Sequence, residues 1–368
     1  MSTNSQSLHQ IALQKFKKNF WGVFSLAFIF LMLVVAIFAY ILAPDSSENA
    51  NWGDLTIRSK SPGFSVQMLK IPLPDAPQKS FSDYFFGEEM QYSKTPISSY
   101  KIEGNRLIYT LYSDDASVNI EKEITLQSFP ESKSLEEVAS KQISTETFLL
   151  GTDKAGRDYL SRMLVGSRVS ISIGFVAVFI SLIVGIFFGA IGGYFGGKID
   201  AFVMWLVNII WSIPTLLLVI AITLSLGKGF WQVFVAVGLT MWVEVARVVR
   251  GQIISVKEMQ FVTAARALGY NDLRIIIHHI LPNIMAPVIV ISAANFASAI
   301  LVESGLSFLG LGAQPPVPSW GGMIKDYYGD IILDKPYLAM VPGIAIMLIT
   351  LAFMMVGNAL RDALDVKS

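Results

Sequence analysis

Six apolar stretches of membrane-spanning length decide what this chain can fold into. The first covers residues 20–43 and contains no charged residue. The other five windows cover about 169–193, 201–225, 229–246, 284–310 and 338–360. A helix needs roughly 20 mostly apolar residues to cross a bilayer, and only 15% of this chain is charged. The chain is therefore predicted to be an all-α polytopic membrane protein with six transmembrane helices.

The distribution of lysine and arginine predicts the orientation of these helices. Positive charge favours the cytoplasmic side in short flanking segments. Three lysines in the lead-in, residues 1–19, therefore place the N-terminus in the cytoplasm. Segment 247–283 carries five basic residues, which are Arg247, Arg250, Lys257, Arg266 and Arg274. Six crossings then put this segment and the tail, residues 361–368, in the cytoplasm, with the chain spanning the inner (plasma) membrane several times.

Residues 44–150 are predicted to form a β-containing extracytoplasmic insert between the first and second spans. Its first part is rich in proline and serine, which favours an extended path with little regular structure. Further on, apolar residues alternate on both sides of a turn at 103–105, which predicts two strands. A third strand would place four apolar side chains on one face, namely Val118, Ile120, Ile124 and Leu126. A helix from Ser134 would return the chain to the membrane.

Composition and spacing exclude several classes of function. A formal net charge of zero argues against a nucleic-acid partner, and the absence of cysteine excludes disulfides and thiolate metal sites. His278 and His279 are adjacent, whereas two metal ligands on a helix prefer a spacing of three or four residues. Residues 192–199 nearly match a phosphate-binding loop, but Ile199 occupies the required hydroxyl position. We therefore expect no enzyme activity, metal or cofactor in this chain.

The charged segment between the fourth and fifth windows contains a compact elbow. Residues 261–268 predict a short helix whose exposed alanines allow close approach of a partner. Gly269 suits the left-handed end of a helix. Asn271 or Asp272 would cap a second helix, residues 273–281, which Pro282 would end. On composition alone, a plain amphipathic surface loop is an equal alternative.

The spacing within the elbow resembles the Glu-Ala-Ala loop of ABC importer permeases. In that pattern Glu-Ala-Ala is followed by three residues, a glycine, nine residues and then Ile-x-Leu-Pro. Thr263 replaces the acidic residue here and His279 replaces the isoleucine, whereas the remaining positions are in register. The resemblance implies a helix that couples the permease to an ATPase subunit. The implied coupling residues are Thr263, Ala264, Ala265, Arg266, Ala267, Leu268, Gly269, Leu281 and Pro282.

Two further runs, residues 150–162 and 303–321, resemble the C-type permeases of oligopeptide, dipeptide and nickel importers. The resemblance implies a type I importer bundle over residues 165–360 that forms the translocation pathway with a homologous B-type permease. It also implies two ABC ATPase subunits, which hold ATP and Mg, and an extracytoplasmic substrate-binding protein or lipoprotein. Alternating access would be driven by the ATPases. Peptides are the expected substrates, although nickel importers share these motifs.

Polar residues within the apolar windows are candidates for lining the pathway, because polar groups at membrane depth tend to face a cavity. Asn208, Trp211 and Ser212 precede Pro214, so they could instead stabilise a bend at that proline. Asn295 has the same two interpretations. Glu303 could contact substrate, or it could hydrogen-bond to helix ends in the outer loop.

Two other features of the apolar windows predict local contacts. Glu244 is expected to form a local ion pair with Arg247. Small residues recur every four positions in the second window, at Ser181, Gly185, Gly189 and Gly193. They predict close helix packing, either within the chain or against a partner subunit.

Two other classes of function fit the sequence less well. A membrane-embedded enzyme would need paired acids, histidine or serine at one depth. A sensor with the bundle as its anchor would not need a structured elbow.

Overall fold

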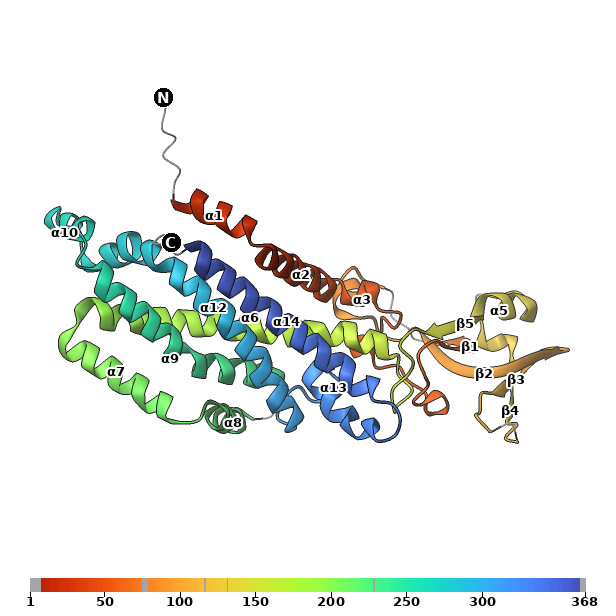
Figure 1. Ribbon diagram of the computed structural model, residues 1–368. Coiled ribbons are helices and arrows are strands. Elements are labelled where there is room, and N and C mark those ends of the chain that lie inside the picture. The colour runs from red at the N-terminus through yellow and green to blue at the C-terminus, as the bar shows by residue number, and fades with distance from the viewer. Residues whose placement is uncertain (1–7, 75–78, 116, 131, 228, 365–368) are drawn as a thin grey trace, which may run out of the picture. The chain divides into compact units, whose positions relative to one another are not determined.

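The computed structural model describes residues 8–74, 79–115, 117–130, 132–227 and 229–364 (Figure 1). Residues 1–7 of the expected lead-in and 365–368 of the expected tail lie outside the described residues. The chain divides into two compact units. The helical unit comprises Met1–Val34, Val169–Pro315 and Ser319–Ser368, and the insert unit comprises Val35–Arg168 with Pro316–Pro318.

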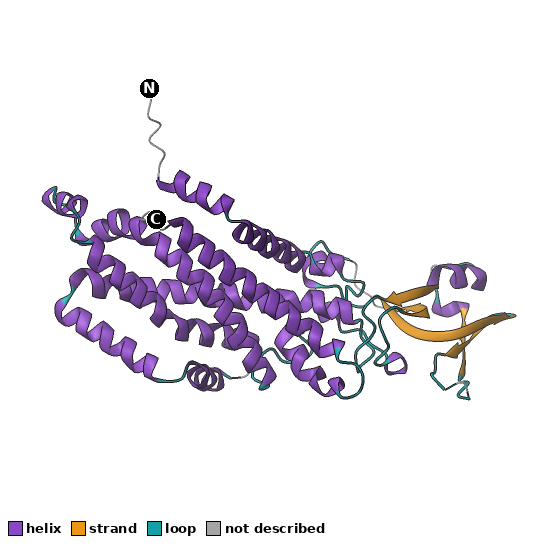
Figure 2. Cartoon of the chain, in the orientation of Figure 1, coloured by secondary structure: helices purple, strands orange, loops and turns teal. Residues whose placement is uncertain are grey.

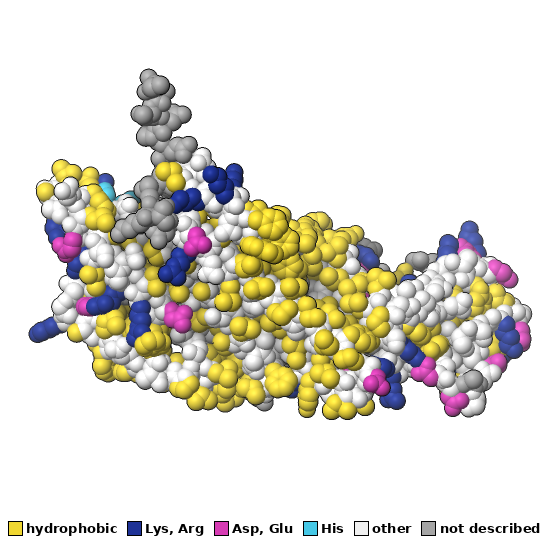
Figure 3. Space-filling view, in the orientation of Figure 1, with side chains coloured by type: hydrophobic (Ala, Val, Ile, Leu, Met, Phe, Trp, Pro, Cys, Tyr) yellow, Lys and Arg dark blue, Asp and Glu magenta, His cyan; other side chains and the backbone are white. Residues whose placement is uncertain are grey.

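Long apolar helices account for most of the helical unit. Among the described residues, five helical stretches are long and apolar enough to cross a membrane. They are α2 (Phe20–Ile37), α6 (Tyr159–Phe195), α9 (Phe230–Val256), the continuous stretch Asp272–Phe308, which ends in α12 (Leu281–Phe308), and α14 (Tyr337–Leu364). Shorter helices are α1 (Leu8–Lys18), α10 (Gln260–Ala267), α11 (Asp272–Arg274) and α13 (Trp320–Tyr327). Figure 3 shows apolar side chains over the middle of this unit and charged ones near α10.

The expected single span at 201–225 is two helices that meet at 93°. Helix α7 (Gly197–Ser212) ends before Pro214, and α8 (Thr215–Leu226) begins after it. The proline ring clashes with a helical residue before it, and Ile213 is accordingly extended, with φ −91° and ψ 129°. The sequence predicts a bend at Pro214, but the structure shows a complete break. The described chain has up to six spans if this bent pair counts as one.

Small residues on α6 pack against α9 of the same chain. A Cβ added at Gly185 would lie 2.5 Å from the Val245 Cβ, and one at Gly189 would lie 2.6 Å from the Ala246 carbonyl oxygen. A Cβ added at Gly193 would lie 2.9 Å from the carbonyl oxygen of Arg250, also on α9. Side chains at these positions would force the two helices apart. The stripe of small residues therefore serves packing within the chain.

The insert unit is built on one antiparallel sheet with the strand order β4-β3-β2-β1-β5 (Figure 2). The strands are β1 (Phe64–Pro72), β2 (Tyr92–Glu103), β3 (Arg106–Leu111), β4 (Glu121–Thr125) and β5 (Ile143–Phe148). Helix α5 (Leu135–Gln142) packs with the sheet through a core that includes Leu69, Leu107 and Val138. Two single-turn helices, α3 (Ala39–Leu42) and α4 (Asp83–Phe86), belong to the same unit.

The predictions for this insert are confirmed in part. Glu103 pairs with Arg106 across the predicted turn, and the Ser134 side chain caps α5 by accepting from the Glu137 N–H. Three expectations are wrong. The proline-rich part contains β1, which pairs with both β2 and β5. Val118 and Ile120 lie before β4 and are exposed. The chain leaving α5 forms β5, because β1 offers it an unpaired edge.

The run 150–162 forms a tightly packed turn at the end of the insert unit. The Asp153 carboxylate accepts from the backbone N–H groups of Ala155 and Arg157, and it pairs with the Arg157 Nε at 2.7 Å. Gly156 has φ +75° and lies directly against the backbone of Asp54. Because neither backbone can move aside, this turn fixes the chain just before α6.

Candidate functional site

The elbow consists of α10 and the helical segment that follows Gly269. Gly269 adopts φ +77°, the left-handed conformation that glycine reaches without strain. Its N–H donates to the Arg266 carbonyl at 3.0 Å, and the Tyr270 N–H donates to the Ala265 carbonyl at 3.2 Å. This pair of bonds is the Schellman motif, which satisfies the last carbonyls of a helix. The predicted helix end at Gly269 is confirmed.

The second helix of the elbow begins as predicted but does not end at Pro282. The Asn271 side chain caps it by accepting from the Arg274 N–H at 2.9 Å. Residues Ile275–Ile280 then form a π-helical segment that continues into α12, so Pro282 lies in the first turn of α12. Proline is tolerated near a helix start, and wider π turns change the hydrogen-bonding pattern before it. The expected stop at Pro282 is therefore wrong.

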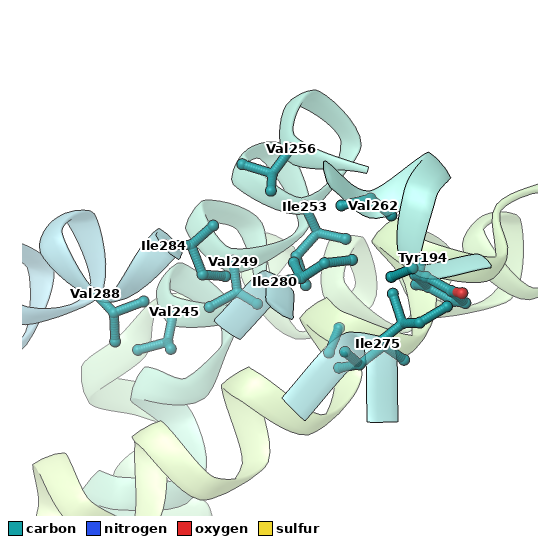
Figure 4. Close-up of a cluster of buried hydrophobic side chains, with 13 residues drawn as sticks. Tyr194, Val245, Val249, Ile253, Val256, Val262, Ile275, Ile280, Ile284 and Val288 are labelled. Carbon is teal, nitrogen blue, oxygen red and sulfur yellow. The ribbon is translucent and has the colours of Figure 1, made fainter. Parts of the chain in front are cut away.

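A cluster of buried apolar side chains holds the elbow onto the helical bundle (Figure 4). From the elbow, Val262 and Ala265 point inward, together with three isoleucines of the π-helical segment. They meet residues of α6, α9 and α12. The bundle side of this elbow cluster consists of Ala190, Tyr194, Val245, Val249, Ile253, Val256, Ile284 and Val288. Protein interiors are close-packed and resist compression, so a displacement of the elbow is transmitted to the ends of the bundle helices.

Polar contacts add a second link between the elbow and α6. The Tyr194 hydroxyl at the end of α6 donates to the Asp272 carboxylate, with 2.6 Å between the oxygens. The Arg266 guanidinium lies 5.9 Å from the Tyr194 ring. Within the elbow, the Arg274 guanidinium lies 4.3 Å from the Tyr270 ring, which also stacks on His279. The contact between Tyr194 and Asp272 joins residues 78 positions apart, so no local sequence signal pointed to it.

The outward face of the elbow is apolar and basic. Most of the expected coupling residues are exposed, namely Thr263, Ala264, Arg266, Ala267, Leu268, Gly269 and Pro282, and Leu281 is half-buried. Ala265 differs from the expectation, because it is buried in the elbow cluster and cannot contact a partner. Leu273 and Ile277, which the sequence did not single out, are also exposed. The elbow therefore exposes apolar side chains together with Arg266 and Arg274.

The polar residues around the break at Pro214 are tied to α9. The Arg247 Nη2 donates to the Asn208 Oδ1 at 2.9 Å, and its guanidinium lies 3.5 Å from the Trp211 ring. Asn208, Trp211 and Ser212 are exposed on this chain. The expected ion pair between Glu244 and Arg247 does not form, because Arg247 turns to α7 instead. A two-point ion pair, Asp200 to Arg250 at 2.5 and 2.6 Å, also joins α7 to α9.

Asn295 and Glu303 are both buried within α12. The side-chain nitrogen and oxygen of Asn295 have no hydrogen-bond partner. Glu303 is fully buried and accepts from the Ser307 hydroxyl at 2.6 Å. That hydroxyl lies 3.4 Å from the Ser319 hydroxyl, which caps α13 by accepting from the Gly322 N–H. Glu303 is thus linked through serine hydroxyls to the start of α13. Asn208 and Trp211 belong to a separate contact, the one with Arg247.

The structure also places the residues that resembled ligand-binding motifs. Helix α6 precedes the glycine-rich run at 192–199, where a phosphate-binding loop requires a strand. Gly196 and Gly197 form the turn into α7, with φ +65° and +54°. Among the described residues, no group of three or more His, Cys, Asp or Glu side chains could hold a metal ion.

Replacing Gly269 by valine is expected to weaken the link between the two elbow helices. The left-handed conformation costs an L-residue about 1–2 kcal/mol, and a β-branched side chain suffers most. No atom lies within 4 Å of the added Cβ, so the cost is conformational. Hydrogen exchange of the detergent-solubilised chain should speed up at residues 265–274. Gly269→Asn, which tolerates this conformation, and Gly251→Val on α9 should exchange like the wild type; slow exchange in Gly269→Val would contradict the expectation.

Comparison with known proteins gives consistent results over most of the chain. Residues 181–367 match the family described as binding-protein-dependent transport system inner membrane component, and residues 7–62 match the N-terminal TM domain of oligopeptide transport permease C. The chain is 43% identical over 217 residues to the dipeptide transport system permease protein DppC of Alkalihalophilus pseudofirmus, covering 59% of this chain and 71% of that protein.

Two further relatives cover similar shares. The glutathione transport system permease protein GsiD of Pectobacterium atrosepticum is 38% identical over 59% of this chain and 72% of its own length. The oligopeptide transport system permease protein OppC of Haemophilus influenzae is 40% identical over 59% of this chain and 70% of its own. The two family matches leave residues 63–180, which include the sheet, unmatched.

Proposed function

Because this chain belongs to the binding-protein-dependent transport system inner membrane components, as an ABC importer permease of the oligopeptide and dipeptide C-type, we propose that its elbow couples ATP hydrolysis to peptide import. The chain is a transport subunit and not an enzyme. ATP and Mg belong to two separate ABC ATPase subunits. Their binding groove would receive the exposed apolar side chains of the elbow, which are Leu268, Leu273 and Ile277.

The observation that carries this proposal is the division of the elbow into two faces. Val262, Ala265 and Ile280 fasten one face to α6, α9 and α12, while the other face is exposed and apolar. A coupling element needs both properties, because it must bind the ATPase subunit and must transmit that subunit's displacement to the bundle without deforming. A loop that only connects two spans would need neither.

The proposed assembly follows from the same family membership. A homologous B-type permease would complete the translocation pathway, and an extracytoplasmic binding protein or lipoprotein would deliver the substrate. The elbow and both termini of the chain would lie in the cytoplasm. The insert unit would lie on the opposite side of the inner membrane. ATP binding would draw the elbows of the two permeases together and open the pathway outward. Hydrolysis would then reset it.

Peptides are the proposed substrates, because the relatives above are named for dipeptide, oligopeptide and glutathione transport. Asn208, Trp211 and Ser212 are proposed to face the pathway, since they are exposed on this chain at a break in a span. Asn295 and Glu303 are buried here, so a pathway role for them would require α12 to move relative to its neighbours. Variants at these five positions should change which peptides are taken up.

The proposal is tested by placing a charge on the outward face of the elbow. Leu268→Asp should abolish peptide-stimulated ATP hydrolysis and uptake in proteoliposomes that contain the complete transporter, because a carboxylate would be buried without a partner in the groove. The variant should still insert in the membrane, since Leu268 makes no buried contact in this chain. Ile332→Asp introduces the same charge at an exposed apolar position elsewhere and should transport normally. Full uptake by Leu268→Asp would exclude the elbow as the coupling site.

A further inference from the structure

The insert unit exposes a group of aromatic side chains that its own core does not use. Phe81, Tyr84 and Phe86 are 79%, 54% and 68% exposed, and on α3 Ile41 and Leu42 are about half exposed. We call these five residues the aromatic patch. Soluble surfaces rarely gather large apolar side chains in this way, and such patches mark contacts with a protein or a membrane.

The patch lies at the end of the first membrane span. Helix α2 ends at Ile37, and α3 begins two residues later at Ala39. Two residues reach at most about 7 Å even when fully extended. The headgroup layer on each side of the hydrocarbon core is about 5–8 Å thick. The start of α3 therefore lies within about 7 Å of Ile37, the last residue of α2.

Helix α4 is held against α3 by contacts around Arg168. The Arg168 Nη1 donates to the carbonyl oxygen of Phe85, and the guanidinium lies 5.0 Å from the Tyr40 ring and 5.7 Å from the Phe86 ring. Gly87 closes the turn with φ +88°, and a Cβ there would lie 2.8 Å from the Tyr40 ring. The position of α4 relative to α3 is therefore set by close packing.

A second set of contacts fixes the chain just after α4. The Glu88 N–H donates to the Ser46 carbonyl at 2.9 Å, and the Glu48 N–H donates to the Glu88 carbonyl at 3.1 Å. The Glu88 carboxylate accepts from the Ser46 hydroxyl and pairs with the Lys79 ammonium at 2.5 Å. A four-residue helix has no stability of its own. Here it is fixed on both sides, while Tyr84 and Phe86 remain more than half exposed.

We propose that the aromatic patch is a membrane-interface anchor, which inserts Phe81, Tyr84 and Phe86 between the lipid headgroups beside the first span. The covalent link to α2 places it at that depth. Its composition is that of the aromatic belt, where rings lie at headgroup level and a tyrosine hydroxyl stays in water. The anchor would hold the insert unit against the bilayer surface.

Spin labels can test this placement because the chain contains no cysteine. The full chain carrying Phe81→Cys or Tyr84→Cys would be labelled with a nitroxide and reconstituted in vesicles of phosphatidylcholine and phosphatidylglycerol. Collisions with oxygen, which concentrates in lipid, are compared with those of a water-soluble nickel chelate. Ile120→Cys provides a matched control, because Ile120 is also an exposed apolar residue of the insert unit.

Labels at 81 and 84 are expected to show an oxygen-to-nickel accessibility ratio several-fold above that at 120. Equal ratios at all three positions would place the patch in water and overturn the proposal. Low accessibility to both reagents at 81 and 84 would mean that protein covers the patch, which also overturns it. Phe81 precedes α4 and is the most exposed of the rings, so its replacement leaves the contacts of Arg168 and Glu88 intact.

Discussion

Replacing Val262 by aspartate should detach the elbow from the helical bundle. Val262 is fully buried in the elbow cluster, which also contains Ile253 of α9 and the isoleucines of the π-helical segment. An uncompensated charge in such a site costs about 3–5 kcal/mol, which exceeds what a short surface helix can lose without opening. Trypsin should then cleave the solubilised chain rapidly after Arg266 and Arg274, whereas the membrane helices should stay protected.

The control for this experiment is the neighbouring residue. Thr263→Asp introduces the same charge one position along α10, where the side chain is exposed. It should leave the cleavage rate close to that of the wild type, because no buried contact is lost. Equal protection of the Val262→Asp chain would show that the elbow cluster does not hold the elbow in place.

A second large effect is expected from Gly156→Ala in the insert unit. The added Cβ would lie 1.8 Å from the carbonyl oxygen of Asp54 and 2.6 Å from its carbonyl carbon. Both are backbone atoms, so the conflict cannot be relieved by rotating a side chain. We expect the free energy of unfolding of the insert unit to fall by more than about 4 kcal/mol. Steric and buried-charge defects are among the few causes of so large a loss. Hydrogen exchange at residues 152–158 should approach that of an unfolded segment.

Gly104→Ala separates this packing effect from backbone strain. Gly104 also has positive φ, +59°, but no atom lies within 4 Å of an added Cβ. The strain of a left-handed alanine alone is about 1–2 kcal/mol. Exchange in the β2–β3 hairpin should therefore rise only moderately. If the two variants behave alike, the close contact at Gly156 contributes nothing.

Local chemistry predicts the parts of this structure that depend on a few neighbouring residues. Gly269 ends α10, Asn271 caps the next helix and Ser134 caps α5, each through a bond to a backbone group three or fewer residues away. Such signals stay valid in any tertiary context. The apolar windows were equally informative, since span length is set by the bilayer.

Features that depend on distant partners could not be predicted. Strand β5 pairs with β1, about 80 residues earlier, and its own pattern was too polar to stand out. Arg247 had an acid within one helical turn, yet it contacts Asn208 and Trp211 on another helix. Ala265 matched a docking motif by spacing but lies in the elbow cluster, because helix rotation decides which alanine faces outward. Sequence spacing alone cannot supply that rotation.

The π-helical segment Ile275–Ile280 has a mechanical consequence for everything that follows it. A π turn holds one residue more than a regular turn, so rewinding it as an α-helix would rotate α12 by about 100° and shift it axially by about 1.5 Å. Asn295 and Glu303 lie downstream on that helix. Rewinding the π-helical segment would therefore rotate and shift α12 as a unit. The same movement could carry Asn295 and Glu303 from one environment to another.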